Sequence, residues 1–305
     1  MMHAPADLRM RFANVADSAL GRAWQDYSDN RVALAAAGAV AGVIALAILA
    51  PLVAPQNPYD LTQLTIMDNL MPPGSRGMTG TLHLLGTDDQ GRDLLSAILY
   101  GLRLSLVVSF AAVAFGLLIG TSVGVIAAYF GGRIDTILMR LVDLQLSFPA
   151  VLIALILLAL LGKGVDKVII ALVSVQWAYY ARTIRGSALV ERRRDYIEAA
   201  RCLALPPSRI MFRHLLPNAF PPLVVVATVQ MAHAISLEAT LSFLGVGVPI
   251  TEPSLGLLIA NGYGYMLSGK YWIAFYPGVA LLLVIFAINL VGDRLRDVMN
   301  PRLKR

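Results

Sequence analysis

The chain is poor in charge and almost free of cysteine. Only 14% of its 305 residues are charged, and 57% are hydrophobic. Soluble domains carry about 25% charged residues, so the composition excludes an ordinary soluble protein and indicates several membrane spans. The one cysteine, Cys202, excludes an internal disulfide, and we interpret it as a structural thiol. No cleavable signal peptide is expected, because the first apolar run is long enough to span a membrane.

Motifs that bind nucleotides or metals are also missing from the sequence. A phosphate-binding loop reads G-x-x-x-x-G-K-[ST], and the nearest string, "LGKGVD" at 161–166, lacks that spacing and the hydroxyl. His233 and Glu238 are five residues apart and form no H-E-x-x-H motif, so we expect neither a zinc site nor an intramembrane protease. If ATP drives this protein, another chain must bind the nucleotide.

Six apolar runs are long enough to suggest membrane-spanning helices. About 20 residues, rising about 1.5 Å each, cross about 30 Å of hydrocarbon, and a helix satisfies all of its backbone polar groups internally. The sequence therefore predicts an all-α integral membrane protein with six transmembrane helices. The predicted spans are Val32–Ala54, Leu104–Phe130, Leu144–Leu161, Val168–Ala181, Leu215–Leu237 and Tyr271–Gly292.

The basic residues fall mainly on one side of this topology. Six spans put both termini on the same side, and 19 of the 25 Lys and Arg residues lie in the two tails and in the second and fourth loops. Cytoplasmic segments carry such an excess, so we predict that both termini and the fourth loop are cytoplasmic. Anionic lipid headgroups then account for the net charge of +6, and no nucleic-acid partner is needed.

An acidic string, "GTDDQGRD" at 86–93, follows the first span on the opposite side of the membrane. A calcium loop requires acids at alternate positions and a glutamate at the twelfth. Here Asp88 and Asp89 are adjacent, and the twelfth position is a leucine. We favour turns at Gly86 and Gly91, followed by a helix whose first amides are capped by Asp88 or Asp89.

Glycines recur every fourth residue in the second predicted span, at Gly116, Gly120 and Gly124. This spacing places them on one face of a helix, where another backbone can approach closely. The partner is either another helix of this chain or a second, similar subunit.

Three ionisable residues lie within or beside the predicted spans. Because an ionisable residue at membrane depth is a functional candidate, Asp143, His233 and Glu238 are candidates for an intramembrane polar role. Asp143 also lies one turn from Arg140, so an ion pair at the membrane surface is an equal alternative.

The string "DYIEAARCLALPPSRIMFRHLLPN" at 195–218 is far longer than a connection between two spans requires. Its first part is rich in helix formers, and a residue before proline avoids the helical region, so the first helix should end near Leu205. Pro207 and Ser208 should begin a second helix, which ends before Pro217. The bent pair exposes small and apolar residues, which marks either a protein interface or a segment lying on the membrane.

This string resembles the EAA loop in the membrane subunits of bacterial ABC importers. The pattern of that loop is E-A-A, three residues, G, nine residues, and I-x-L-P. The matching residues are Glu198, Ala199, Ala200, Leu216 and Pro217. Ala204 stands at the glycine position and His214 at the isoleucine position. The alanine leaves open whether the turn is made there or by the two prolines that follow.

Other strings extend the resemblance over nearly the whole chain. They are "LGTDDQGRDLLSAILYGLRLSL", "DLQLSFPAVLIALIL", "FRHLLPN", "LEATLSFLGVGV" and "NLVGDRLRDVMNPRLKR". All are similar to the C-type permease of dipeptide, oligopeptide and nickel importers. The chain departs from these relatives at Leu255, where tryptophan is common. The resemblance implies the type I importer permease fold in the bacterial inner membrane.

The resemblance also implies several partners. A second permease would complete the pathway, two cytoplasmic ATPases would hold ATP and Mg, and an extracytoplasmic binding protein would deliver the substrate. This chain itself would bind no cofactor or metal and would not be an enzyme. Its EAA loop, residues 182–217, would dock on an ATPase. The implied docking residues are Glu198, Ala199, Ala200, Ala204, Arg209, Arg213, Leu216 and Pro217.

We divide the chain into residues 1–101, with the tail, first span and outer segment, and residues 102–305, a five-helix transport domain. Spans two to five should line a pathway for peptides. The residues expected to face the binding protein are Gly86, Thr87, Asp88, Asp89, Gly91, Arg92 and Asp93. The alternatives are a nickel or glutathione permease of the same family, or a stand-alone proton-coupled transporter that uses Asp143 or Glu238.

Overall fold

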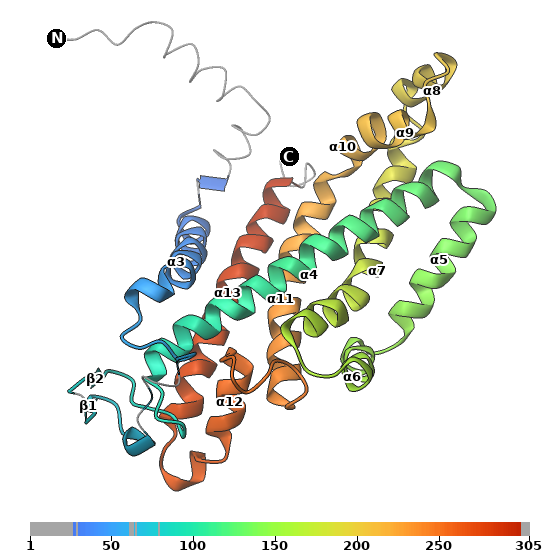
Figure 1. Ribbon diagram of the computed structural model, residues 1–305. Helices are drawn as coiled ribbons and strands as arrows, with labels where there is room; N and C mark the ends of the chain where they lie inside the picture. The colour runs from blue at the N-terminus through green and yellow to red at the C-terminus, as the bar shows by residue number, and fades with distance from the viewer. Residues whose placement is uncertain (1–26, 29, 61–63, 65, 79, 300–305) are drawn as a thin grey trace, which may run out of the picture.

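The structure, a computed structural model, describes residues 27–28, 30–60, 64, 66–78 and 80–299. It is an elongated bundle of helices (Figure 1), with one antiparallel ribbon formed by β1 (Ser75–Arg76) and β2 (Leu82–His83). The helical elements are α3 (Arg31–Val53), η2 (Ile66–Asp68), α4 (Leu94–Phe130), α5 (Gly132–Ser147), α6 (Ala150–Leu161), α7 (Val165–Glu191), α8 (Asp195–Cys202), α9 (Pro207–Arg209), η3 (Ile210–Leu215), α10 (Leu216–Ala219), α11 (Pro221–Phe243), α12 (Leu255–Tyr263), η4 (Met266–Ser268) and α13 (Trp272–Met299).

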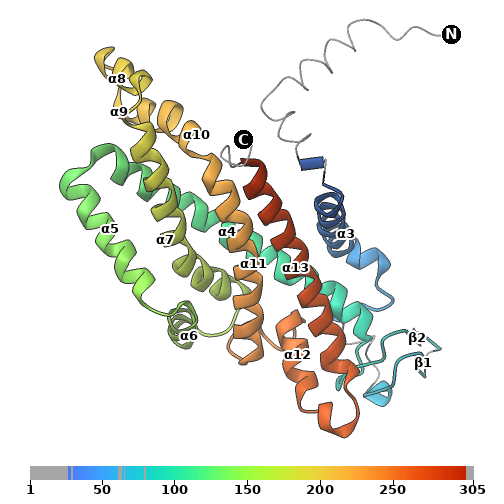
Figure 2. The same ribbon diagram turned by 180° about the vertical axis from the view of Figure 1, so that it is seen from behind.

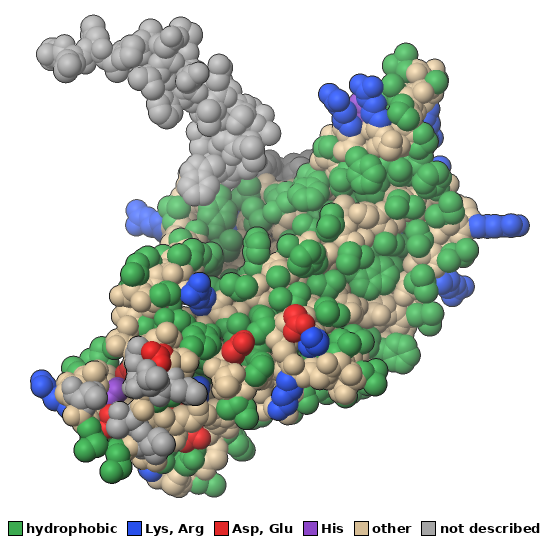
Figure 3. All heavy atoms as spheres, in the orientation of Figure 1, with side chains coloured by type: hydrophobic (Ala, Val, Ile, Leu, Met, Phe, Trp, Pro, Cys, Tyr) green, Lys and Arg blue, Asp and Glu red, His purple; other side chains and the backbone are tan. Residues whose placement is uncertain are grey.

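The two ends of the bundle differ in what they present. Figures 1 and 2 show α8 and α9 projecting at one end, with α12, β1 and β2 at the other. We name these the α8 end and the α12 end. On the face drawn in Figure 3, hydrophobic side chains cover the middle of the molecule, and Lys and Arg gather at the α8 end. Apolar side chains over the middle are what a membrane-embedded protein requires.

Four helices of the described chain are long and apolar enough to cross a membrane, namely α3, α4, α11 and α13. The pair α5 and α6 makes a fifth only if it counts as one span. Helix α7 has 27 residues but a more polar composition. The count of six spans and the cytoplasmic side of both termini stay predictions, and residues 1–26 and 300–305 lie outside the described chain.

The third predicted span, Leu144–Leu161, is wrong as a single straight helix. It is divided between α5 and α6, which meet at an angle of 90°. Phe148 is extended, with φ −98° and ψ 145°, because Pro149 disfavours the helical region for the residue before it. Helix α6 has only 12 residues, or about 18 Å, which is short of the roughly 30 Å of hydrocarbon.

Two predicted boundaries also need correction. Helix α4 begins at Leu94 and continues unbroken through residue 101, so the division between 1–101 and 102–305 does not correspond to a break in the structure. Helix α11 begins at Pro221, whereas the predicted fifth span begins at Leu215. The six intervening residues belong to η3, α10 and the residue Phe220, which precedes α11.

The glycine face of α4 packs against α7 of the same chain. A Cβ atom on Gly116 would lie 3.3 Å from the ring of Tyr180, and one on Gly120 would lie 2.7 Å from Tyr180 Cβ. A Cβ on Gly124 would collide with the carbonyl of Ala181. Of the two alternatives for these glycines, the structure therefore shows packing within the chain.

Candidate functional site

The EAA loop begins as a continuation of α7. This helix extends to Glu191, ten residues beyond the predicted end of the fourth span, and a short turn leads into α8. Two acids, Asp195 and Glu198, lie in the first turn of α8. Negative charge is favourable there, because the free amides and the helix dipole make this end partly positive.

Two residues beyond the end of α8, Ala204 has a left-handed backbone, with φ 52°. The Leu205 N–H donates to the Ala200 carbonyl at 3.2 Å, and the Ala204 N–H donates to the Arg201 carbonyl at 2.9 Å. Together these bonds are the pattern of a Schellman cap, whose left-handed position is usually glycine. Ala204 therefore makes the turn that glycine makes in the family pattern, and the two prolines only follow it.

The inner face of the EAA loop is apolar and packs on α4 and α7. Its buried residues share one cluster with side chains from both helices. From the loop these are Ile197, Ala200, Ile210, Met211 and Leu215, and from the two helices they are Val125, Ala128, Tyr180, Ile184 and Ala188. Ala200 is only 5% exposed, so it supports α8 from inside. The close approach of an ATPase at Ala200 stays a prediction.

The outer face of the EAA loop presents apolar side chains next to charges. Leu203 is 74% exposed and Phe212 is 49% exposed. Around them lie other exposed residues of the predicted docking set: Glu198, Ala199, Ala204, Arg209, Arg213 and Pro217. Leu216 is partly buried. Exposed apolar side chains rimmed by charge are typical of a protein interface.

The second half of the loop continues through Pro217, where a helix end was predicted. In η3 the helix widens to a π-helix, and the Leu216 N–H donates to the Met211 carbonyl. Pro217 then lies in the first turn of α10. Because proline lacks the backbone N–H, this position donates no helical hydrogen bond.

Two ion pairs join α5 to α7 near the α8 end. Asp143 pairs with Arg182, and the predicted partner Arg140 is wrong. Both partners are 55% exposed, and the intramembrane polar role considered for Asp143 stays a prediction. The second pair was not predicted: Arg185 donates from Nε and Nη2 to Asp135 at 2.6 Å.

The acidic string near the α12 end forms an internal network. Asp88 accepts hydrogen bonds from the backbone amides of Gln90 and Arg92, and from Arg92 Nε at 2.7 Å. Helix α4 is capped by Asp93, which accepts from the Ser96 amide at 2.8 Å. The expectation that Asp88 or Asp89 caps this helix is therefore wrong, although Asp88 does satisfy amides of the preceding turn.

Most residues of this string are buried. The side chains of Thr87, Asp88, Arg92 and Asp93 are each at most 1% exposed. Gly86 and Gly91 are buried as well and supply positive φ angles of 83° and 74°. These residues shape the segment from inside, and their contact with a binding protein stays a prediction. Asp89 alone of the predicted set is partly exposed.

Glu238 is fully buried between helices near the α12 end. Its carboxylate accepts hydrogen bonds from Ser105 Oγ at 2.7 Å and Ser242 Oγ at 2.8 Å. It therefore joins α11 to α4. No group of three or more potential metal ligands occurs among the described residues.

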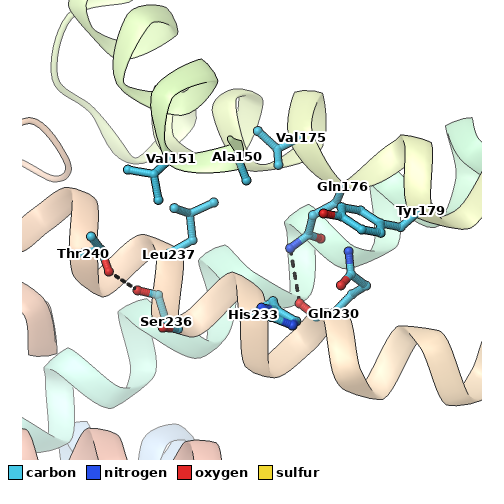
Figure 4. A pocket seen from close by; sticks show the side chains of 10 residues that line it. All are labelled: Ala150, Val151, Val175, Gln176, Tyr179, Gln230, His233, Ser236, Leu237 and Thr240. Atoms are coloured by element: carbon cyan, nitrogen blue, oxygen red, sulfur yellow. Dashed lines mark hydrogen bonds between the residues drawn. The ribbon is translucent and has the colours of Figure 1, made fainter. Parts of the chain in front are cut away.

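A cavity of about 210 Å³ lies between α6, α7 and α11. Figure 4 shows its polar side chains, with Gln176 and Tyr179 of α7 facing Gln230 and His233 of α11. Gln176 Nε2 donates to the Gln230 carbonyl at 3.2 Å. Gln176 Oε1 is buried and has no partner among the described residues. Polar groups without charge thus gather inside an otherwise apolar bundle.

A second cavity, of about 670 Å³, continues from the first toward the α8 end. The two share Tyr179, Gln230 and His233, and the second also reaches Asp293 and Arg296 of α13. Together they form a groove along α11 in which polar side chains lie among apolar ones, and we call it the α11 groove.

Sequence inspection found only one residue of the α11 groove, His233. A signal for the others was present, since Gln230, His233, Ser236 and Thr240 recur every three or four residues in an apolar span. This spacing puts them on one face of a helix.

Comparison with known proteins identifies the family of this chain. The family described as "binding-protein-dependent transport system inner membrane component" matches residues 120–305. The chain belongs to this family. The N-terminal transmembrane domain of oligopeptide transport permease C also matches, over residues 18–73. The protein is therefore a multi-pass inner-membrane permease of a binding-protein-dependent transport system.

Individual relatives agree with the family. A putative peptide transport system permease protein of Brucella suis is 42% identical over 262 residues, which cover 86% of this chain and 85% of that protein. The dipeptide transport system permease protein of Haemophilus influenzae is 36% identical over 282 residues, which cover 92% and 94%. Among solved structures, an inward-facing MetNI methionine ABC transporter superposes with a TM-score of 0.55 and 23% identity, covering 67% of this permease and 97% of that chain. This last likeness shows an importer permease fold.

Proposed function

We propose that this permease forms half of an ATP-driven pathway for peptides, with the EAA loop as its contact to a cytoplasmic ATPase. The observation that carries the proposal is the form of the loop. An apolar inner face ties α8 to α4 and α7, and an outer face presents Leu203 and Phe212 among charges. A partner that moves α8 therefore also moves the two helices to which α8 is packed.

The α11 groove is the proposed half-pathway. Polar side chains facing lipid are costly, so in membrane helices they line a water-filled path or meet a partner. A second permease placed over this face would enclose the groove. Its uncharged amides, hydroxyls and imidazole suit the amide groups of a peptide, which both donate and accept hydrogen bonds. The names of the relatives from Brucella and Haemophilus point to the same class of substrate.

The remaining partners follow the division of labour in such importers. ATP and Mg belong to two ATPase subunits, and a binding protein delivers the substrate at the α12 end. The sequence of this permease has no phosphate-binding loop. We therefore assign it no enzymatic step.

Charge reversal on α8 tests the docking role directly. Glu198 is exposed in the first turn of α8, and we propose that it meets a basic residue of the ATPase. In Glu198→Lys two like charges would face each other, so the ATPases should no longer co-purify with the permease, which should still reach the membrane. The measurement is affinity capture of the tagged permease from solubilised membranes.

Asp166→Lys is the matched control. Asp166 is 68% exposed and lies at the opposite end of α7 from the EAA loop. This variant carries the same charge change and should keep the ATPases bound. Normal capture of the ATPases by Glu198→Lys would remove the role given to Glu198.

A further inference from the structure

An apolar cavity of about 310 Å³ lies between α3, α4, α11 and α13. Its lining includes Val43 of α3, Phe110 of α4, Met231 of α11 and Ala287 of α13. Only one of the lining side chains is polar, that of Thr228, and its hydroxyl donates to the Val225 carbonyl at 2.8 Å. A buried water needs two to four polar partners, so this lining is unsuited to water.

The cavity lies between four helices that are long and apolar enough to span a membrane. Near its ends α3 shares clusters with the bundle, Ala33 with Val298 and Ala50 with Leu99. In its middle, Val43 packs against the main core cluster but is only partly buried, and it also lines the cavity. The space therefore opens beside the middle of α3, away from both membrane surfaces.

The mouth of the cavity is on the outside of the bundle. Ile44 and Phe110 contribute to its lining and are 43% and 68% exposed. The α11 groove uses the opposite face of α11 and includes no residue of α3 or α4. If a second permease covers the groove, as the proposed function requires, the mouth between α3 and α4 is left to the bilayer.

We propose that this cavity binds one acyl chain of a membrane phospholipid. A flexible hydrocarbon chain enters from the bilayer between α3 and α4, and fills the space that the middle of α3 leaves open. The favourable energy of binding comes from van der Waals contacts between the acyl chain and lining side chains that otherwise face empty space. The acyl chain thereby completes the packing of α3 on the other three spans.

Photolabelling of the complete transporter tests this site. The complex is reconstituted in nanodiscs that contain a phospholipid with a diazirine in the middle of one acyl chain. After illumination, adducts are mapped by peptide mass spectrometry. We expect lipid adducts on the cavity residue Met231, which is partly buried. In Ala227→Phe the new ring fills the cavity, and the Met231 adduct should be lost.

Two further variants separate a specific effect on the cavity from a general effect of substitution. Ile44→Trp narrows the exposed mouth without changing the buried packing, and should also remove the Met231 adduct. Ala114→Phe places the same ring on an exposed position of α4 outside the lining, and should leave the adduct unchanged. An unchanged Met231 adduct in both cavity variants would overturn the lipid site. A cross-link from the cavity to a second permease would also overturn it, while leaving the proposed transport function intact.

Discussion

At the scale of single residues, Ala204 carries the backbone strain of the EAA loop. It is one of two non-glycine residues with positive φ in the described chain. For an L-residue the left-handed conformation costs about 1–2 kcal/mol. The Schellman hydrogen bonds and the apolar packing beneath α8 hold it there. The strain lies beside the proposed docking surface, where a fixed orientation of α8 matters most.

Replacing Ala204 by glycine should relieve this strain. Ala204→Gly is expected to stabilise the C-terminal turn of α8 by about 1 kcal/mol, which slows local amide exchange about fivefold. Hydrogen exchange of the Leu205 amide measures this. Ala199→Gly, in the interior of the same helix, should do the opposite, because glycine is unfavourable within a helix. Faster exchange in Ala204→Gly would contradict the assigned turn.

The pKa of Asp89 makes the stability of the folded permease depend on pH. Burial, together with the neighbouring carboxylate of Asp88, raises the pKa of Asp89. The folded state then holds the proton more tightly than the unfolded state. Its contribution to stability is complete below the unfolded pKa and is lost as pH rises through the folded pKa.

Asp89→Asn removes this ionisation with little change in shape. The variant should have a higher thermal unfolding midpoint than the wild type near neutral pH, and the difference should shrink as the pH falls below the unfolded pKa of about 3.9. Thermal unfolding of the purified permease at both pH values provides the measurement. An equal difference at the two pH values would mean that ionisation is not the cause.

At the scale of elements, the contact of α4 with α7 depends on the absence of side chains. Gly120→Ala would bring a methyl group against the backbone of α7, and such overpacking costs about 1–3 kcal/mol. Gly186→Ala is the control, since its Cβ meets nothing within 4 Å and a helical alanine gains about 0.5–1 kcal/mol over glycine. Thermal unfolding midpoints should fall for the first and rise for the second. A rise for both would exclude close packing at Gly120.

Hydropathy predicted the starts of α3 and α13 well, but it missed the start of α4, the end of α7 and the irregular elements. Helices α3 and α13 begin within one residue of their predicted starts, because long apolar runs define them. Pro149 marks the break between α5 and α6 in the sequence, but the apolar run that contains it predicted one straight span. The π-helical turn before Pro217 depends on how η3 packs against α4 and α7, which a local pattern does not contain.

Side-chain partners were the hardest part to predict. Arg140 is close to Asp143 in the sequence, but Arg182, which is 39 residues away, makes the pair. For the same reason the string at 86–93 was interpreted as a surface, whereas its polar groups satisfy one another inside the segment. Sequence spacing identifies chemically active residue types, and tertiary packing decides which groups they meet.

At the scale of the whole molecule, two unlike cavities lie on opposite faces of α11. The polar α11 groove requires a partner or water, and the apolar cavity beside α3 suits lipid. The EAA loop projects at one end of the molecule. This distribution fits one subunit of a larger transporter better than a carrier that works alone.

Transport by reconstituted protein tests most directly whether this permease works as one subunit of an ATP-driven transporter. Proteoliposomes that contain the permease with its second permease, ATPases and binding protein should take up a labelled dipeptide only when ATP is supplied. The permease alone should show no uptake, even under an imposed proton gradient. Gradient-driven uptake by this chain alone would contradict the account and favour a proton-coupled transporter.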